Sequence, residues 1–187
     1  MREMIDLKNP PAEGKKNVTR RGVLAVLRNP KNNTYLTLRW KHEPWTTFIT
    51  GGIDEGEDLV EGALREIHEE TGYTNVRYVR ELGGPVHTQF FASHKDENRT
   101  ALGTIMLFEL ESDEKTEVSA EEEAKHDVVW IKEEELSKTD FQHAEIDLIR
   151  SWLAGAPSVY VGDGILTHSG AFDGRGNREA FEDIVKS

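Results

Sequence analysis

The chain has 187 residues, which is enough for one ordinary globular domain with an appendage. Its formal net charge of -12 argues against sequence-independent binding of nucleic acid through a basic surface, because phosphate contacts need clustered Lys and Arg. The chain has no Cys, which excludes disulfides and thiolate zinc sites and favours a reducing, cytoplasmic compartment.

The sequence contains nothing that resembles a signal peptide or a membrane span. The N-terminal stretch is polar, and no apolar run approaches the roughly 20 residues that a spanning helix needs. We therefore expect a soluble protein without a membrane partner.

The first part of the chain reads as a lead followed by strands. Residues 1–19 are expected to be extended, because Pro10 and Pro11 exclude a helix, although Ile5 can still add to a sheet edge. Residues 22–28 form a continuous apolar run typical of a strand buried on both faces, and residues 34–40 return as its hairpin partner. A short strand over 46–50 then leads into a glycine-rich stretch.

That stretch, residues 51–73, is the most informative part of the sequence. Its glycines and acidic residues predict a tight loop, and residues 58–71 have the composition and apolar spacing of a helix. Glu66, Glu69 and Glu70 lie at i, i+3 and i+4, so their carboxylates are expected on one side of this helix.

Carboxylates at this spacing repel each other by a few tenths of a kcal/mol per pair, on the order of the i,i+4 effect in exposed helices. Binding of a divalent cation would explain the clustered carboxylates, because Mg2+ and Mn2+ prefer oxygen ligands. Mg2+ in particular is commonly held by carboxylates together with substrate phosphates. The alternative is a solvated acidic helix face. The preceding glycine loop and the embedded Arg65 favour the metal site.

The spacing of these residues resembles the signature of the Nudix hydrolase family. The pattern runs through Gly51, five residues, Glu57, seven residues, and then the stretch from Arg65 to Tyr73, REIHEETGY, without a departure. The resemblance implies a loop, helix and loop that bind Mg2+ or Mn2+ and cleave a nucleoside diphosphate linked to another moiety. The substrate would then be a nucleotide-type small molecule.

The resemblance also implies roles for individual residues. Glu66, Glu69 and Glu70 resemble the metal ligands, and Glu66 or a neighbouring carboxylate resembles the group that activates water. Arg65 and Glu57 resemble the partners of a structural ion pair that orients the helix against the loop. The resemblance also places Arg65 among the catalytic residues. Gly51 resembles the residue that lets the loop backbone reach the metal.

Beyond the helix the sequence predicts further strands and a second helix. We expect strands over 76–82 and 86–91, broken at residues 83–85, and a polar surface loop over 93–100. The remaining elements are a buried strand over 102–110, a short strand over 128–131 and a helix over 140–154. This order resembles the Nudix α/β/α sandwich with a mixed β-sheet, an α/β fold.

The sequence suggests three segments. Residues 1–19 form the lead, residues 20–155 the Nudix-like domain, and residues 156–187 a glycine-rich tail that ends in a short amphipathic helix. The tail resembles a segment of leucyl-tRNA synthetases near the exit of the editing domain, which implies that the unit is inserted in a larger synthetase. A flexible extension is the other interpretation.

Other candidate residues are less specific. Glu121, Glu122 and Glu123 stand where relatives often supply one more acidic ligand, although each taken singly is better explained as part of a solvated charge run. The histidines lack metal-ligand spacing. The cations that would suit a distal phosphate are Arg39, Lys41, Arg77 and Arg99.

Two functions follow. The first is a metal-dependent hydrolase of a pyrophosphate bond, and the second is a non-catalytic Nudix-fold module that recognises a ligand within a synthetase. The intact signature favours the first. Many family members are dimers, so a homodimer is compatible with the resemblance, whereas the particular nucleoside diphosphate derivative is not encoded in any motif that we identify.

Overall fold

The computed structural model describes residues 4–6, 9–143, 146–155, 158–161 and 164–167. The chain separates into two compact units, which are described separately. One unit consists of residues 23–81 and 105–142, and the other of residues 1–22, 82–104 and 143–187. Three long strands, β2 (Asn17–Asn29), β6 (Val76–Ala92) and β7 (Glu97–Leu110), contribute residues to both units.

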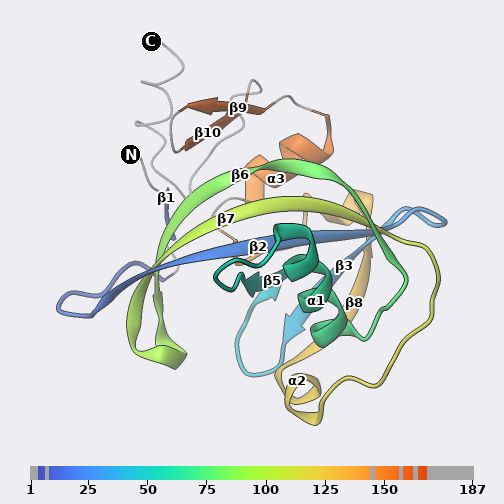
Figure 1. The fold of residues 1–187 in the computed structure, drawn as a ribbon, viewed down its shortest axis with the longest axis horizontal. Coiled ribbons are helices and arrows are strands. Elements are labelled where there is room, and N and C mark those ends of the chain that lie inside the picture. Colours follow the sequence, from blue (N-terminus) through green and yellow to red (C-terminus); the bar gives the residue numbers. More distant parts are fainter. Residues whose placement is uncertain (1–3, 7–8, 144–145, 156–157, 162–163, 168–187) are drawn as a thin grey trace. The chain divides into compact units, whose positions relative to one another are not determined.

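The unit of residues 23–81 and 105–142 holds the glycine-rich loop and its helix (Figure 1). Its further strands are β3 (Thr34–Trp40), β4 (Thr46–Thr47), β5 (Ile49–Gly52) and β8 (His126–Lys132). Its helical elements are α1 (Leu59–Thr71), the short α2 (Ala120–Lys125) and the 3-10 turn Glu133–Glu135. β3 pairs antiparallel with β8 along seven residue pairs, from Thr34 with Lys132 to Trp40 with His126.

An apolar core fixes α1 within this unit. Leu27 and Phe108 from the strands and Ala63 and Ile67 from α1 all have 0% exposed surface. Burial at this level supplies most of the stabilisation of a helix in a protein, because an isolated 13-residue helix is only marginally stable in water. The face of α1 that carries Ile67 is therefore held inside, and the carboxylates lie on the rest of its surface.

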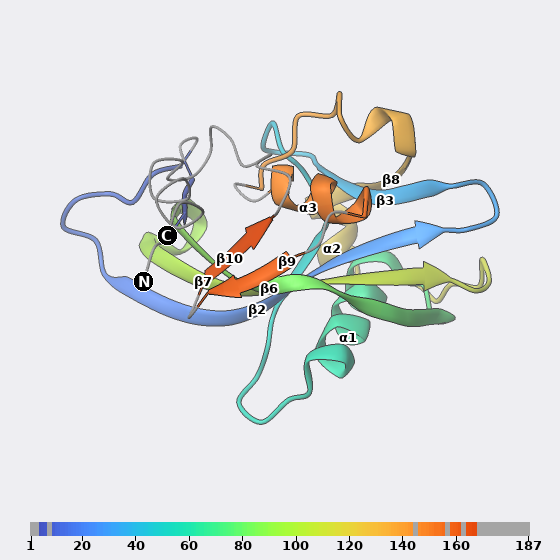
Figure 2. The same cartoon turned by 90° about the horizontal axis from the view of Figure 1, so that it is seen from above.

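The other unit contains β1 (Met4–Ile5), the 3-10 turn Ser93–Lys95, α3 (Ile146–Leu153) and a hairpin of β9 (Ser158–Val161) and β10 (Gly164–Thr167) (Figure 2). β1 pairs parallel with β6. The predicted addition of Ile5 to a sheet edge is thus confirmed.

Strand order follows from the printed pairings of the described residues. The hydrogen-bonded neighbours are β1, β6, β7, β2, β3 and β4 in that order, with β5 on β2 and β8 on β3. Because β1 is parallel to its neighbour and β3 is antiparallel to β2, β4 and β8, the sheet is mixed. The α/β class with a mixed sheet that the sequence predicts is confirmed.

Two local predictions were wrong. The chain does not break at residues 83–85, because β6 runs unbroken from Val76 to Ala92. The neighbouring strand β7, whose Gly103 and Thr104 lie directly against Gly84, supports the extended course of β6 at this point and overrides the turn preference of residues 83–85. Residues 93–100 are not one loop either, since β7 already begins at Glu97.

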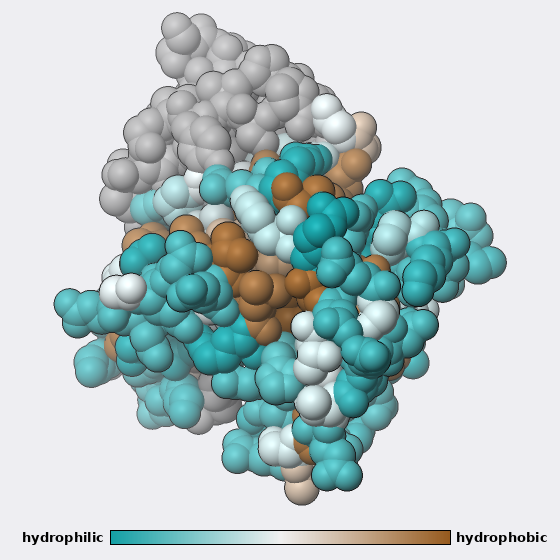
Figure 3. Space-filling view, turned by 45° about the vertical axis from the view of Figure 1, so that its right-hand side comes forward, coloured by the Kyte–Doolittle hydropathy of each residue, from teal (hydrophilic) through white to brown (hydrophobic). Residues whose placement is uncertain are grey.

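Of the predicted tail, residues 156–187, the structure describes only residues 158–161 and 164–167. Residues 158–161 and 164–167 form the β9–β10 hairpin, whereas residues 156–157, 162–163 and 168–187, including the predicted terminal helix, lie outside the described residues. Hydrophilic residues dominate the visible face of the described part, around a smaller apolar area (Figure 3). Among the described residues, no helix is long and apolar enough to cross a membrane.

The core predicts a clear difference between two aromatic truncations. Phe108→Ala removes a ring with 0% exposure and should lower the free energy of unfolding by about 3–5 kcal/mol. Tyr78→Ala is the matched control, because its ring packs edge-on against Phe108 at 5.6 Å between centroids but is 36% exposed, so we expect a loss of about 1 kcal/mol. Urea unfolding measures both values, and equal losses would contradict the described core.

Candidate metal and catalytic site

The helix α1 is capped at both ends by the residues that the sequence provides there. Asp58, in extended conformation, accepts hydrogen bonds from the backbone N–H of Val60 at 2.8 Å and of Glu61 at 3.2 Å. Gly72 ends the helix in the left-handed conformation with φ of 76°, and its N–H donates to the His68 carbonyl. The helix that carries the acidic residues therefore ends at Thr71 as the sequence predicts and begins at Leu59, one residue later than predicted, because Asp58 is its N-cap.

Arg65 ties this helix to the loop that precedes it. Its guanidinium donates to both carboxylate oxygens of Glu57, at 2.9 and 3.1 Å, and to the backbone carbonyl of Gly52 at 3.0 Å. Glu57 in turn accepts a hydrogen bond from the backbone N–H of Asp54 at 2.9 Å. Hydrogen bonds from Arg65 hold the pKa of Glu57 below its usual range, and those to Glu57 and Glu66 raise the pKa of Arg65.

The same guanidinium also holds the first of the predicted ligands. Arg65 Nη1 donates to Glu66 Oε1 at 2.7 Å, and the Glu66 side chain is only 14% exposed. Burial raises the pKa of Glu66, and the hydrogen bond from Arg65 opposes that rise. One arginine thus orients both the loop carboxylate Glu57 and the helix carboxylate Glu66.

Gly51 lies directly against Glu66. A Cβ built on Gly51 would lie 1.9 Å from Glu66 Cδ and 2.4 Å from Glu66 Oε1, so no other residue fits without moving the carboxylate. A Cβ on the neighbouring Gly52 would have nothing within 4 Å. The close approach that the sequence predicts for the loop backbone at Gly51 is therefore an approach to the Glu66 side chain.

The three helix carboxylates differ sharply in environment. Glu69 is 54% exposed and lies 3.5 Å from Arg65, whereas Glu70 is largely buried and its Oε2 has no hydrogen-bond partner in the described residues. Burial, followed by the negative charges of Glu66 and Glu122, raises the pKa of Glu70 to about 9. Such a shift reports a carboxylate whose negative charge lacks compensation in the protein alone.

A second element completes the acidic cluster. Glu122 lies on α2, where the Ser119 hydroxyl accepts a hydrogen bond from its backbone N–H, and His126 is the first residue of β8. One ligand atom from each of Glu70, Glu122 and His126 lies within 4.8 Å of the others. Among the three candidates that the sequence leaves open, the structure brings Glu122 to Glu70.

The environment of Glu122 distinguishes it from its neighbours. Its side chain is 22% exposed, compared with 82% for Glu121. Lys125 Nζ contacts both carboxylates, at 3.1 Å from Glu121 Oε1 and 2.5 Å from Glu122 Oε1. Burial lowers the pKa of His126, although the nearby Glu122 carboxylate opposes that shift.

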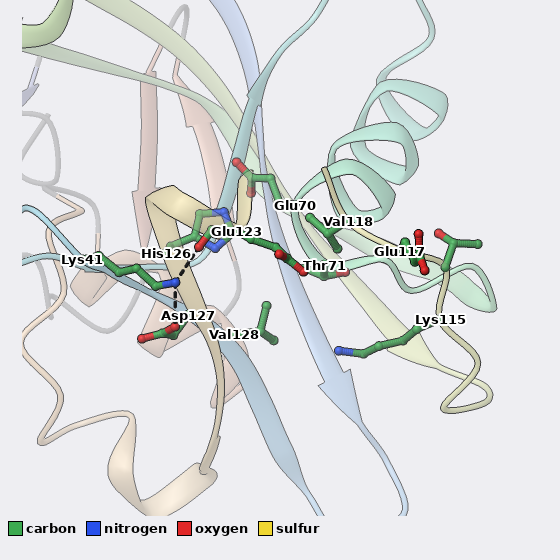
Figure 4. A pocket seen from close by; sticks show the side chains of 11 residues that line it. Lys41, Glu70, Thr71, Lys115, Glu117, Val118, Glu123, His126, Asp127 and Val128 are labelled. Carbon is green, nitrogen blue, oxygen red and sulfur yellow. Dashed lines mark hydrogen bonds and ion pairs between the residues drawn. The ribbon is translucent and has the colours of Figure 1, made fainter. Parts of the chain in front are cut away.

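A cavity of about 440 Å³ lies beside Glu70 and His126, whereas Glu66, Glu69 and Glu122 are not among the residues that line it (Figure 4). Glu70 and His126 line it together with Lys41 and Lys115. Lys41 Nζ lies 3.2 Å from Asp127 Oδ1, and Lys115 Nζ lies 4.0 Å from the centroid of the Tyr73 ring. Among the cations that the sequence proposes for phosphate, Lys41 is at the cavity.

The other proposed cations are differently placed. Arg77 pairs with Glu109 at 2.6 Å, and Arg99 with Glu97 at 3.0 Å, so both guanidinium groups are engaged. Neither of these arginines, nor Arg39, lines the cavity.

The donor set fits a divalent cation. The carboxylates of Glu70 and Glu122 stand close to each other and to His126, and a buried oxygen of Glu70 lacks a partner in the described residues, although buried polar atoms are normally satisfied. Glu66, Glu69 and Glu70 come from the predicted helix. Glu122 lies 52 residues beyond Glu70 in the sequence. The sequence predicted no metal-binding role for His126, but its i,i+4 spacing from Glu122 is a signal for the pair.

Comparisons with known proteins identify the family of this chain. The sequence profile of the NUDIX domain family matches residues 18–152. The RNA pyrophosphohydrolase of Caulobacter vibrioides strain NA1000 / CB15N is 39% identical over 74 residues, which cover 38% of this chain and 42% of that protein. This chain thus matches less than half of the length of that curated relative.

Solved structures show the same fold. The MutT protein from Methanosarcina mazei Go1 aligns with a TM-score of 0.52 at 20% identity, over 76% of this chain and 97% of that one. The MutT NUDIX hydrolase from Burkholderia pseudomallei aligns with a TM-score of 0.50 at 20% identity, over 71% and 98%. With the profile match over most of the sequence and the Arg65-centred loop and helix in place, the chain belongs to the NUDIX domain family.

Proposed function

We propose that this protein hydrolyses a pyrophosphate bond in a nucleoside diphosphate linked to another moiety. The observation that carries the proposal is the buried carboxylate of Glu70, which has an unpartnered oxygen and stands beside Glu66 and Glu122. The names of the curated relatives, RNA pyrophosphohydrolases, support the class of reaction. Each of those matches spans less than half of the relative, so the substrate does not transfer with the name.

Glu66, Glu69, Glu70 and Glu122 are the residues that would hold the metal ion, which we propose to be Mg2+ or Mn2+. When bound, the ion supplies Lewis acidity at the phosphate oxygens and lowers the pKa of a water molecule. The all-oxygen donor set of the four carboxylates suits both ions. Gly51 contributes by leaving room for Glu66.

Glu66 and Arg65 have different proposed roles in the reaction. Glu66 is the proposed general base, because its carboxylate is mostly buried and its orientation is fixed by Arg65 on one side and by the Gly51 backbone on the other. Arg65 is a positioning residue, since its other hydrogen bonds go to Glu57 and Gly52. A base held in one orientation loses little freedom on reaching the reactive geometry.

The cavity favours a substrate that arrives with neutralising cations. Lys41 and Lys115 are positive, but Glu70, Glu117, Glu123 and Asp127 also line it, so an unaccompanied polyphosphate would meet a net negative wall. A metal ion reverses this local balance, because it is often the largest charge in a site. This supports a metal-bound phosphate derivative as the substrate.

Several broader expectations remain proposals. We propose that residues 20–155 form the Nudix domain, with residues 1–19 as its lead and residues 156–187 as its tail. We also propose that this cysteine-free chain is located in the cytoplasm. The resemblance of the tail to a leucyl-tRNA synthetase segment and a homodimeric state are likewise retained as hypotheses. Their direct test is the mass of the native assembly and the identity of proteins that copurify with it.

Hydrolysis of a substrate panel tests the proposed function. We expect cleavage of one class among ADP-ribose, nucleoside triphosphates, diadenosine polyphosphates, leucyl-adenylate and 5′-triphosphorylated RNA, measured as phosphate or nucleotide release with Mg2+ or Mn2+. Glu70→Gln keeps the volume but removes the charge, so turnover should fall about 100-fold or more.

Glu61→Gln is the matched control for that variant, because Glu61 is exposed on the first turn of the same helix. It should retain full turnover. If Glu70→Gln remains as active as Glu61→Gln, the acidic cluster is not the catalytic site.

The adjacent glycines provide a second test. Gly51→Ala places a methyl group where Glu66 lies, so the carboxylate must move, and a displacement of about 1 Å can cost roughly 100-fold in rate. Gly52→Ala adds the same methyl group in open space and preserves the carbonyl that Arg65 binds. We expect kcat to fall about 100-fold for the first variant only, and equal rates would refute the role assigned to Gly51.

A further inference from the structure

A second unpartnered polar group stands beside the unpartnered oxygen of Glu70. The His126 side chain is 2% exposed, and neither of its ring nitrogens makes a hydrogen bond within the described residues. Buried imidazoles normally donate from one nitrogen and accept at the other. A buried ring that makes no hydrogen bond, with one nitrogen facing the Glu122 carboxylate at 3.5 Å, therefore points to a ligand between such groups.

The position of the ring indicates which ligand. His126 Nε2 lies 3.5 Å from Glu122 Oε2, and a ligand atom of the ring lies within 4.8 Å of those of Glu70 and Glu122. Two oxygens held by bonds of about 2.1 Å on opposite sides of one cation are about 4.2 Å apart, so the three groups are nearly close enough for a shared ion.

The surrounding structure holds the ring in place. His126 pairs with Trp40 in the β3–β8 register, and the two rings contact edge to face with centroids 5.7 Å apart. The nearest lysines are engaged elsewhere, Lys41 with Asp127 and Lys125 with Glu121 and Glu122. Neither lysine makes a hydrogen bond to the His126 ring.

We propose that His126 is a nitrogen ligand of the divalent cation and gives the site a preference for Mn2+ and other first-row transition metals over Mg2+. The inference rests on the proposed metal-dependent function and adds to it a donor from outside the carboxylate set. Imidazole binds transition metals well, whereas Mg2+ strongly prefers oxygen. The metal preference of the site, and not only its catalytic rate, is therefore predicted to depend on the His126 side chain.

Pulsed EPR of the metal-free full chain loaded with Mn2+ alone tests the ligand directly. We expect a modulation from directly bound 14N that changes when the protein is labelled with 15N only in histidine. The labelled wild type decides whether a histidine binds the ion even if a variant fails to fold. Absence of any histidine nitrogen coupling would overturn the proposal.

Two matched variants identify which histidine is responsible. His126→Asn should remove the nitrogen coupling, whereas His68→Asn should retain it, because His68 is exposed on α1 and contacts the Thr116 hydroxyl at 2.8 Å. Retention of the coupling in a folded His126→Asn protein contradicts the proposal.

Calorimetric titration with each ion separately measures the selectivity. Loss of His126 should weaken Mn2+ binding about tenfold or more and change Mg2+ binding much less. Equal losses for both ions would overturn the claimed preference. Turnover in the substrate panel is measured separately from metal binding. Nitrogen coupling without hydrolysis would contradict the enzyme function alone. Hydrolysis without nitrogen coupling would contradict only the role of His126.

Discussion

Crowding of negative charge in a partly buried place is the constraint on which the site depends. Burial raises the pKa of Glu70, and the negative charges of Glu66 and Glu122 raise it further. Arg65 compensates Glu57 and Glu66, but Glu70 has no cation of its own among its hydrogen-bond partners. The fold tolerates this because α1 is fixed by its apolar face.

Core packing, the hydrogen bonds of Arg65 and strand pairing fix the elements that carry the crowded carboxylates. The core cluster that includes Ala63 and Ile67 fixes the rotation of α1, and Arg65 fixes the loop before it. The β3–β8 pairing fixes where His126 begins its strand, directly after α2. The proposed metal ligands therefore lie on a helix, a short helix and a strand, and each of these elements is positioned by packing or strand pairing.

Local sequence patterns predicted those features that depend on nearby residues. The extent of α1, predicted over residues 58–71 and observed over Leu59–Thr71, depends on residues close together in the sequence, and the pairing of Arg65 with Glu57 was implied by the family resemblance. The unbroken course of β6 through Gly83 to Pro85 could not be predicted, because it depends on partner strands from distant parts of the chain. Glu122 could not be singled out from Glu121 and Glu123 for the same reason, since only the packed structure shows which of them faces Glu70.

Thermal unfolding of the metal-free protein with increasing Mn2+ tests the central claim most directly, at constant ionic strength maintained with a monovalent salt. A hundredfold excess over Kd stabilises the folded state by about 2.7 kcal/mol, which corresponds to a rise of roughly 5–10 °C in Tm for a chain of this size. The account predicts a saturable rise for the wild type and for Glu61→Gln and little rise for Glu70→Gln. Equal rises in all three proteins, or none in the wild type, would contradict it.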